Sequence, residues 1–244
     1  MSERVVLVTG AGSGIGRATA IALLKAGYVV ACGYNTSRAH AERIQKDYAN
    51  AFAVKIDIAS RTSVTRAVAA TRKHFGRDIA ILVNNAALVQ EKPFETITDA
   101  DWDRMLAVNL RGAFITAQEC LPGMLARKWG RIVNITSIGG QWGGMRQVHY
   151  AAAKAGLINL THSLAKLYSG FGITANAVAP GLVATDMIKK ELKSKAGKQK
   201  AAQIPAGRIA APEEIAAGIV YLVSDGAAYV SGQTLNINGG MLMS

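Results

Sequence analysis

The chain has 244 residues, half of them hydrophobic, and a net charge of +12 at pH 7. This length and apolar content suit one large α/β domain, no stretch of about 18 uncharged apolar residues predicts a membrane span, and the first residues lack the pattern of a signal peptide, so we expect a cytoplasmic protein. The positive charge can attract nucleic acid, a membrane surface or an anionic substrate, but no zinc-finger, RNA-binding or helix-turn-helix pattern accompanies it. Cys32 and Cys120 indicate neither a disulfide framework nor a metal site.

A continuous apolar run, Val5 to Val8, predicts a first strand that is buried on both faces of a parallel sheet. A glycine-rich stretch follows at once, and a helix is predicted from Ala18 to Lys25. Glycines in this place let the backbone approach a pyrophosphate closely, while the helix N-terminus supplies amide donors and a favourable dipole. A tight turn without a ligand is the alternative. The residues of this stretch that we expect to bind a cofactor are Gly10, Ser13, Gly14, Ile15 and Gly16.

A second strand, Tyr28 to Gly33, and a helix from about Ser37 to Tyr48 complete the first β-α-β unit. The end of this strand normally addresses the adenosine ribose, where a carboxylate would accept from the 2′-hydroxyl and a basic group would bind a 2′-phosphate. No carboxylate occurs here, whereas Asn35, Ser37 and Arg38 are candidate phosphate contacts. The pattern favours NADP over NAD, although Arg38 is equally typical of a solvated first helical turn.

The next strand is predicted over Ala51 to Ile58 and contains Asp57 near its end. This carboxylate is placed either to accept a hydrogen bond from an adenine amino group or to cap the helix that begins near Ser60 and includes Val64 to Phe75. Ile58 is the second cofactor candidate at this strand end.

A fourth strand, Ile79 to Val83, is followed by Asn84, Asn85 and Ala86. Two amide side chains at a strand end either tie neighbouring strands together or support a cofactor. Tying the strands together is at least as compatible with the sequence as supporting a cofactor. Asn85 and Ala86 are the candidates for a cofactor contact.

The segment Asp101 to Cys120 has helical periodicity. An Asn in a helix interior is mildly unfavourable, so Asn109 is expected to have a specific reason to be there. The side chains predicted to form a buried stripe are Trp102, Met105, Leu106, Leu110 and Phe114.

Tyr150 and Lys154 lie four residues apart in a run of helix formers, so the phenol and the ammonium are predicted on one helix face. The unperturbed pKa of a phenol is about 10, and a fixed positive charge nearby would favour the phenolate. The same spacing also arises by chance in many helices. Ser137 follows the strand predicted over Arg131 to Thr136, and a hydroxyl at the carboxyl tip of a buried strand lies where open α/β sheets place their ligands.

The remaining pattern continues the alternation with a strand over Ile173 to Val178, a helix over Pro212 to Val223 and a strand over Thr234 to Ile237. Strands that alternate with helices along the whole chain predict one doubly wound parallel sheet, a Rossmann fold, over residues 1–244. Residues of about 185–207 interrupt the alternation and are predicted to form a lid over the substrate site.

Six lysines occur between Lys189 and Lys200 in this predicted lid, against a single Glu191. Such a run either attracts an anionic substrate carrier, such as coenzyme A or an acyl carrier protein, or is an ordinary solvated helix face.

Together these residues resemble the short-chain dehydrogenase/reductase family over essentially the whole chain. Within that family, the run of residues 179–187 and the ending of residues 238–241 are most similar to bacterial 3-oxoacyl-[acyl-carrier-protein] reductases. Acetoacetyl-CoA reductases and sugar or alcohol dehydrogenases share much of the pattern. The residues that carry the resemblance, in family order, are Gly10, Gly14, Gly16, Asp57, Asn84, Asn85, Ala86, Asn109, Ser137, Tyr150, Lys154, Pro180 and Gly181.

The resemblance implies an NADPH-dependent reduction of a ketone to a secondary alcohol, by hydride transfer and protonation of the alkoxide. In that reaction Tyr150 is the general acid, Lys154 lowers the pKa of Tyr150 and holds the nicotinamide ribose, and Ser137 hydrogen-bonds the substrate oxygen. Asn109 would hold a water that relays protons to Lys154, and Thr185 would contact the nicotinamide carboxamide. No metal is required. The cofactor residues beyond those already named are Tyr150, Lys154, Pro180, Gly181, Val183 and Thr185.

The resemblance also implies a homotetramer whose interfaces use the helix that bears Tyr150 and the C-terminal segment. Two other classes of protein remain as alternatives. A cofactor-binding regulator would be expected to lack one of Ser137, Tyr150 or Lys154, and all three are present. A nucleic-acid binder would bind without NADP and would lose affinity steeply with salt.

Overall fold

In the computed structural model, which describes residues 4–185 and 201–243, seven strands form one parallel sheet in the order β3-β2-β1-β4-β5-β6-β7. The chain builds outward from β1 in one direction and from β4 in the other, so the order reverses between these two strands. This arrangement confirms the predicted doubly wound α/β fold and places the topological switch point beside β1. The strands are β1 (Val5–Val8), β2 (Val29–Tyr34), β3 (Ala51–Lys55), β4 (Ile79–Asn84), β5 (Gly130–Ile135), β6 (Ile173–Pro180) and β7 (Thr234–Ile237).

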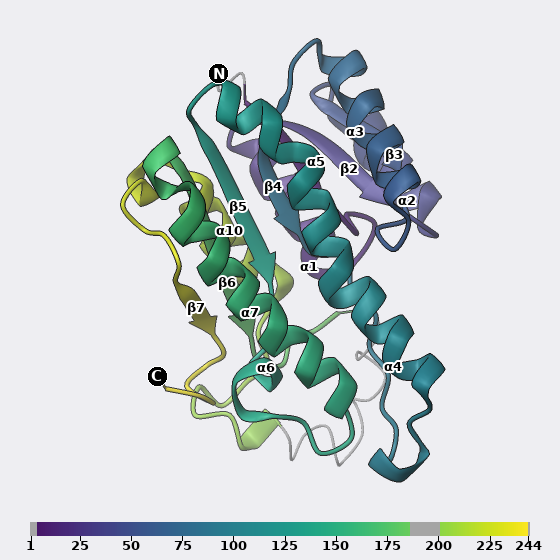
Figure 1. Ribbon diagram of the computed structural model, residues 1–244. Helices are drawn as coiled ribbons and strands as arrows, with labels where there is room; N and C mark the ends of the chain where they lie inside the picture. The colour runs from purple at the N-terminus through teal and green to yellow at the C-terminus, as the bar shows by residue number, and fades with distance from the viewer. Residues whose placement is uncertain (1–3, 186–200, 244) are drawn as a thin grey trace.

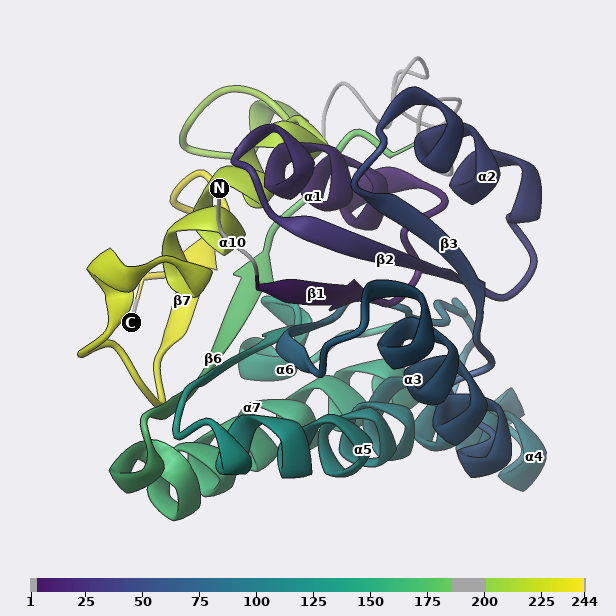
Figure 2. The same ribbon diagram turned by 90° about the horizontal axis from the view of Figure 1, so that it is seen from above.

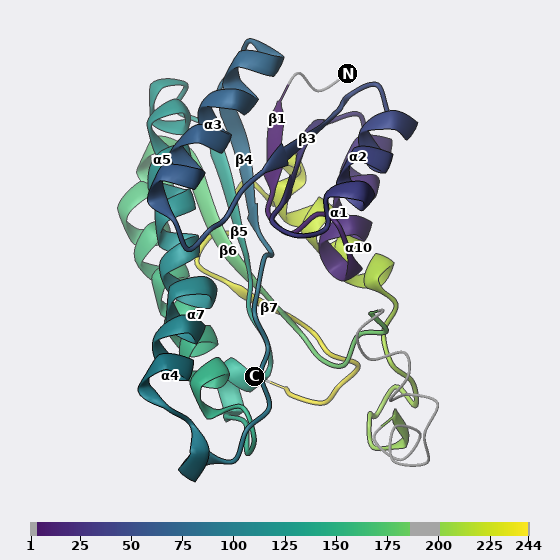
Figure 3. The same ribbon diagram turned by 90° about the vertical axis from the view of Figure 1, so that its right-hand side faces the viewer.

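Helices cover both faces of the sheet (Figures 1 and 2). One layer consists of α1 (Gly14–Lys25), α2 (Arg38–Asp47) and α10 (Pro212–Val223), and the other of α3 (Arg61–Phe75), α5 (Gly112–Ala126) and α7 (Val148–Tyr168). The short helices α4 (Asp99–Leu106) and α6 (Gly139–Trp142) lie beyond the carboxyl ends of the strands (Figure 3). Within the described residues, no helix is both long and apolar enough to cross a membrane.

The first strand shows why the sequences of the strands are continuous apolar runs. Successive side chains of a strand point to opposite faces, and here both faces are covered. Val6 and Val8 join the core cluster that includes Leu23 of α1 and Ile219 of α10. Leu7 joins the cluster on the other face, with the apolar side chains of α3 and α5. All four side chains of β1 are at most 1% exposed, so a polar substitution at any of them would bury an unpaired group.

Among the element boundaries that differ from the predicted ones, two bear on the site. Helix α1 begins at Gly14, four residues before the predicted start, because the chain turns directly out of β1 through Gly10 and Gly14, whose φ values are +68° and +50°. Such positive φ values are accessible to glycine without a steric penalty. Strand β3 ends at Lys55, so Asp57 lies in the connection to α3 and not within the strand.

The predicted buried stripe between Asp101 and Cys120 is only partly correct. Met105 is fully buried, but Trp102 and Phe114 are 38% and 41% exposed in the chain. Trp102 precedes the irregular part of this helix, whereas Phe114 follows a π-helical segment, Ala107–Arg111, between α4 and α5. The wider turn takes one additional residue, which changes the phase of the helix and brings Asn109 to the inside.

The predicted lid can be followed only at its two ends, because residues 186–200 and their lysine run lie outside the described residues. At the near end, Val183 forms an isolated parallel bridge with Ala210. At the far end, Ile204 is 3% exposed, so it anchors the returning chain to the core.

Buried amides join the layers at the carboxyl ends of β4 and β5. The Asn84 side chain donates to Oδ1 of Asn134 at 2.9 Å and accepts from the Thr116 hydroxyl of α5 at 2.6 Å. Asn134 in turn donates to the Thr161 hydroxyl of α7 at 2.9 Å. One network of neutral side chains therefore connects two strands with two helices, next to the switch point.

Replacing Asn84 by Ala should lower the free energy of unfolding by about 2 kcal/mol or more, because Asn134 and Thr116 would each lose a buried partner. Urea unfolding measures the change. The control is Gln118→Ala, whose side chain accepts from Arg61 at an exposed position and whose loss should change the stability by less than about 0.5 kcal/mol. Equal losses in the two variants would contradict this account of the network.

Candidate active site

The glycine-rich connection from β1 to α1 is packed against the chain that follows β4. The Thr9 hydroxyl accepts from the main-chain N–H groups of Asn85 and Ala86, both at 3.0 Å. The Asn85 side chain donates to the carbonyl oxygens of Thr9 and Gly10 at 2.9 and 3.2 Å. Its amide therefore ties the chain after β4 to the glycine turn after β1, and a contact of Asn85 with the cofactor stays a prediction.

The turn, residues 10–16, is shaped as a cradle that admits no side chain at Gly12 or Gly16. A Cβ at Gly16 would overlap the carbonyl oxygen of Gly10, and a Cβ at Gly12 would lie 2.5 Å from Cβ of Ser37. Ile15 follows Gly14 in the first turn of α1, so its main-chain N–H belongs to the group of donors at the helix N-terminus. The cradle fits a pyrophosphate, which such turns bind through main-chain N–H groups and the helix dipole.

The N-cap of α1 is Ser13, whose side chain makes no capping hydrogen bond within the described structure. The Ser13 side chain is exposed beside the cradle. Its position is compatible with its predicted role as a cofactor contact, which stays a prediction.

A cavity of about 480 Å³ lies where β2 ends, and its lining residues are Thr36, Ser37, Arg38, Ala39, His40 and Glu42. Two of the three predicted phosphate contacts, Ser37 and Arg38, are thus brought to one cavity, and Asn35 is exposed just before it. Arg38 Nε donates to Glu42 at 2.7 Å, a surface pair within α2. This hydrogen bond is the main cause that raises the pKa of Arg38.

The two candidates after β3 serve the local structure. Asp57 Oδ1 accepts from the N–H of Ala59 at 3.0 Å, whereas Ser60 caps α3 by accepting from Ser63. Ile58 is 8% exposed, and its side chain would contact any Cβ placed at Gly112 of α5. A contact with adenine at Asp57 remains a prediction.

The segment after β6 returns to the glycine cradle. A Cβ at Gly14 would lie 3.0 Å from Cγ2 of Thr185, so the predicted carboxamide contact is next to the start of α1. The Gly181 N–H donates to Ile237 of β7 at 3.1 Å. Pro180, Gly181, Val183 and Thr185 therefore run from the carboxyl end of β6 toward the cradle.

The three residues that the sequence singled out for chemistry are brought together at the carboxyl end of β5. Ser137 Oγ accepts from the N–H of Gly139 at 3.1 Å, and its hydroxyl is hydrogen-bonded to that of Tyr150. Lys154, one turn along α7, has Nζ 5.5 Å from the centre of the Tyr150 ring. Its ammonium donates to the Ile135 carbonyl of β5 at 2.8 Å.

The charges of this cluster differ from the expectation that Lys154 lowers the pKa of Tyr150. Burial raises the pKa of Tyr150 to about 12, and the hydrogen bond from Ser137 offsets only part of that rise. Burial also lowers the pKa of Lys154 to about 7, since an ammonium that is 2% exposed loses its hydration. Burial therefore favours the neutral form of both groups, and desolvation is the largest cause acting on the Tyr150 phenol.

Asn109 does have a specific structural reason for its place in the helix. Its side chain donates to the Leu88 carbonyl at 2.9 Å and accepts from the Leu88 N–H at 3.2 Å. It also donates to the Met105 carbonyl at 3.2 Å. The amide is engaged on both sides, and the predicted proton-relay water stays a prediction.

Gly140 is a site residue that the sequence analysis missed. A Cβ there would lie 2.8 Å from the carbonyl carbon of Lys154 and 2.9 Å from its Cβ. Helix α6 can approach the backbone of α7 at Lys154 only because residue 140 is glycine. The pair Gly139 and Gly140 so soon after Ser137 is the sequence signal that indicates such an approach.

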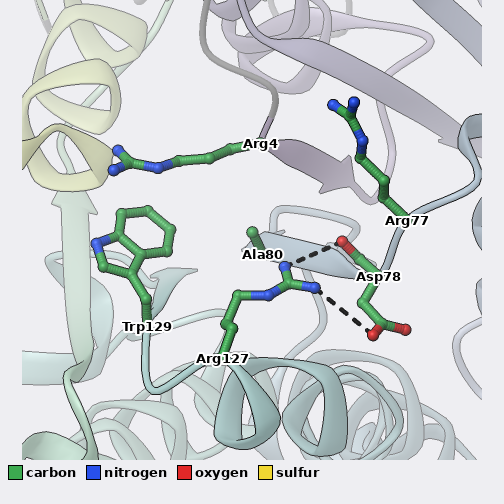
Figure 4. A pocket seen from close by; sticks show the side chains of 6 residues that line it. All are labelled: Arg4, Arg77, Asp78, Ala80, Arg127 and Trp129. Carbon is green, nitrogen blue, oxygen red and sulfur yellow. Dashed lines mark hydrogen bonds and ion pairs between the residues drawn. The ribbon is translucent and has the colours of Figure 1, made fainter.

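A second depression, of about 510 Å³, lies at the other edge of the sheet, at the amino ends of β1, β4 and β5 (Figure 4). Arg4 lies 3.9 Å from the centre of the Trp129 ring and pairs with Asp225 at 2.9 Å. Arg127 donates to the main-chain oxygen of Asp78 at 3.1 Å. The arginine charges that face Trp129 and Asp78 in this depression are engaged with partners at the amino edge, far from Tyr150.

Comparisons with known proteins agree with this geometry. A family model described as enoyl-(acyl carrier protein) reductase matches residues 10–242. The chain is 39% identical to the acetoacetyl-CoA reductase of Rhizobium meliloti over 98% of both chains. It is 41% identical to the 3-oxoacyl-[acyl-carrier-protein] reductase FabG of Pseudomonas aeruginosa, over 100% of this chain and 99% of the relative. The corresponding FabG of Aquifex aeolicus is 40% identical over 99% and 98%.

The lowered pKa of Lys154 predicts how stability depends on pH. Between pH 7 and about 10.5 the unfolded chain holds the Lys154 proton and the folded chain does not, so the free energy of unfolding rises with pH by up to about 1.4 kcal/mol per unit. Lys154→Met removes this contribution. Urea unfolding of the cofactor-free proteins at pH 7, 8 and 9 should show the wild type gaining stability relative to the variant, and parallel curves would refute the buried neutral amine.

Proposed function

Because this chain belongs to the short-chain dehydrogenase/reductase family, we propose that it reduces the ketone of a 3-oxoacyl thioester to a secondary alcohol with NADPH. The observation that carries the proposal is the contact between the Ser137 and Tyr150 hydroxyls, with the buried Lys154 amine beside the Tyr150 ring. Two hydroxyl donors that converge at the carboxyl end of a strand suit an oxygen on which negative charge develops. The chain is thus an oxidoreductase that acts on keto and CH–OH groups.

The nicotinamide cofactor, when bound, supplies the hydride. The residues of the chain orient the ketone and complete the reaction. The Ser137 hydroxyl, fixed by the Gly139 N–H, donates to the substrate oxygen as it becomes an alkoxide. Tyr150 then gives its proton to that oxygen, since an alkoxide is a stronger base than a phenolate.

The charges of the site suit the reducing direction. With its pKa raised to about 12, Tyr150 stays protonated at neutral pH and is ready to act as an acid. The phenolate that remains after proton donation favours the protonated form of Lys154, since an opposite charge stabilises the ammonium. The carbonyl of Ile135 accepts a hydrogen bond from the amine and so holds it in position beside the phenol. Lys154 thus helps to stabilise the phenolate once it has formed.

The cofactor proposal rests on the cavity at the end of β2. It offers the Ser37 hydroxyl, the Arg38 guanidinium and His40, and its one carboxylate, Glu42, is already paired with Arg38. A 2′-phosphate bound there would compete with Glu42 for the guanidinium. This chemistry supports NADP over NAD.

The substrate proposal rests on the relatives and on the rim of the site. Two segments flank Tyr150, one that contains Lys92 and one that contains Arg146. The Lys92 N–H joins them by donating to the Arg146 carbonyl at 2.8 Å. Both segments carry exposed apolar side chains, among them Val89, Trp142 and Met145. An apolar rim suits an acyl chain better than a sugar. Acetoacetyl-CoA is the alternative substrate, as the Rhizobium relative is named for its reduction.

The proposal extends to a homotetramer in the cytoplasm. Apolar side chains that are exposed in the single chain lie on the helical layer that includes α7, and also near the C-terminus. Examples are Leu167 at 61%, Phe171 at 51% and Tyr229 at 103% exposure. These exposed apolar side chains are the ones that the proposed association would bury.

Tyr150→Phe should lower kcat by about 100-fold or more, the usual contribution of a positioned general acid, while NADPH binding stays within about twofold. The measurement is NADPH oxidation with acetoacetyl-CoA and with a 3-oxoacyl carrier substrate, and NADPH fluorescence titration is the binding control. A 2-enoyl thioester serves as a contrast, because the matched family model is described as an enoyl reductase. Near-normal turnover of the variant would end this assignment of the general acid.

NADPH should bind more tightly than NADH, and Arg38→Ala should reduce that preference by about 5- to 50-fold, since hydrogen bonds to charged groups are among the stronger ones. Titration of each cofactor against wild type and variant measures the ratio. Glu42→Gln is the matched control: it frees Arg38 from its surface partner and should leave the preference unchanged or greater. Tighter binding of NADH by the wild type would overturn the cofactor proposal.

A further inference from the structure

We propose that His149, acting through Gln90, is a positioning residue that fixes residues 88–92, here called the 88–92 loop, against the first turn of α7 and so sets the affinity for the ketone substrate. The inference rests on the proposed function and extends it to residues outside the catalytic cluster. The loop follows β4 at the carboxyl edge of the sheet, and His149 directly precedes Tyr150. A bond between these two elements thus controls the distance from the loop to the reacting phenol.

A continuous chain of hydrogen bonds joins α7 to α4 through the loop. His149 Nε2 lies 2.8 Å from Gln90 Oε1. Gln90 Nε2 donates to Asp101 Oδ1 at 2.9 Å. The other oxygen of Asp101 accepts from Lys92 Nζ at 2.5 Å and from the Thr98 N–H at 3.0 Å. The first turn of α4 therefore anchors the loop from one side, and His149 anchors it from the other.

The direction of each bond follows from the carboxylate at the end of the chain. The hydrogen bond from Lys92, followed by that from Gln90, holds the pKa of Asp101 well below its usual range, so this group only accepts. Gln90 must therefore turn its NH₂ group toward Asp101 and its oxygen toward His149. It follows that His149 carries a proton on Nε2 and donates it to Gln90.

His149 depends on this one bond for its orientation. The ring is 0% exposed, so water is not at hand to replace Gln90. Its other nitrogen, Nδ1, has no hydrogen-bond partner within the described part of the chain. Loss of the Gln90 contact would thus leave both the ring and the loop without their mutual polar anchor.

The loop is also fastened on either side of Gln90. Asn109 holds the main chain of Leu88 through two hydrogen bonds, and the Lys92 N–H donates to Arg146. Between these points lies Val89, a side chain of the apolar rim described above, which is 42% exposed. Gln90 therefore fixes the middle of a segment whose ends are held, and its loss should loosen the rim without displacing Ser137 or Tyr150.

The test uses the full-length protein with acetoacetyl-CoA and NADPH as the probe. His149→Leu and Gln90→Met each remove the shared bond while keeping a similar volume, and the double variant tests their coupling. His149→Gln is the rescue variant, because its amide nitrogen is as many bonds from Cα as Nε2 of histidine and is also a donor. Glu91→Ala is the matched control: it alters the same loop, removing an exposed contact of 3.2 Å with Gln147.

Each single variant should raise KM for acetoacetyl-CoA by about 5- to 10-fold, with kcat changed less than about threefold, as expected for one buried hydrogen bond that acts on binding. The double variant should raise KM no more than either single one, because both act through the same bond. His149→Gln should recover most of the loss, and Glu91→Ala should behave as wild type. Multiplicative effects in the double variant, a fall in kcat at unchanged KM, or an equal effect of Glu91→Ala would each overturn the proposal.

Amide hydrogen exchange of the peptide covering residues 86–93 gives a readout that needs no activity. Exchange there should quicken in His149→Leu and Gln90→Met, and should match wild type in His149→Gln and Glu91→Ala. Unchanged exchange in Gln90→Met refutes the positioning role even if His149→Leu fails to fold. A wild type that exchanges as expected but reduces no ketone would refute the proposed function while leaving the anchor of the loop supported.

Discussion

The hydrogen bond from the buried Lys154 amine to the Ile135 carbonyl is the contact on which the site depends. It ties the second turn of α7 to the carboxyl end of β5, two residues before Ser137, and so fixes the helix that bears Tyr150 relative to the strand that Ser137 follows. In this buried position the amine loses its hydration, which lowers its pKa to about 7. Gly140 completes the arrangement, because only a residue without a side chain lets α6 close over Lys154.

The rest of the carboxyl edge consists of polar groups that satisfy one another. Thr9 and Asn85 join the glycine turn to the chain after β4, and Asn84 joins β4 to β5 and α5. Parallel strands end with unpaired main-chain groups at this edge. Short amide and hydroxyl side chains form hydrogen bonds with these groups. The same residues hold the cradle open, so the support of the fold and the support of the cofactor site are one structure.

The two edges of the sheet use charge differently. At the carboxyl edge the described site has one buried amine and neutral hydroxyls, whose properties are governed by burial. At the amino edge, Arg4 lies over Trp129 and Arg127 pairs with Asp78 (Figure 4). Arg4 also pairs with Asp225. Part of the net charge of +12 is thus engaged in surface pairs, and such exposed pairs contribute little individually to stability.

The sequence by itself determined the doubly wound fold, because strands buried on both faces are continuously apolar and the glycines after Val8 have few other uses. It also brought Ser137, Tyr150 and Lys154 together, since a strand end and one helix face are predictable from local periodicity. Only the tertiary structure decided the rest. The π-helical turn at Asn109 shifted the helix phase ahead of Phe114, burial raised the pKa of Tyr150, and the contact of His149 with Gln90 joined residues 59 positions apart. Helix phase, desolvation and long-range pairing depend on what surrounds a residue in space, and local sequence does not contain that information.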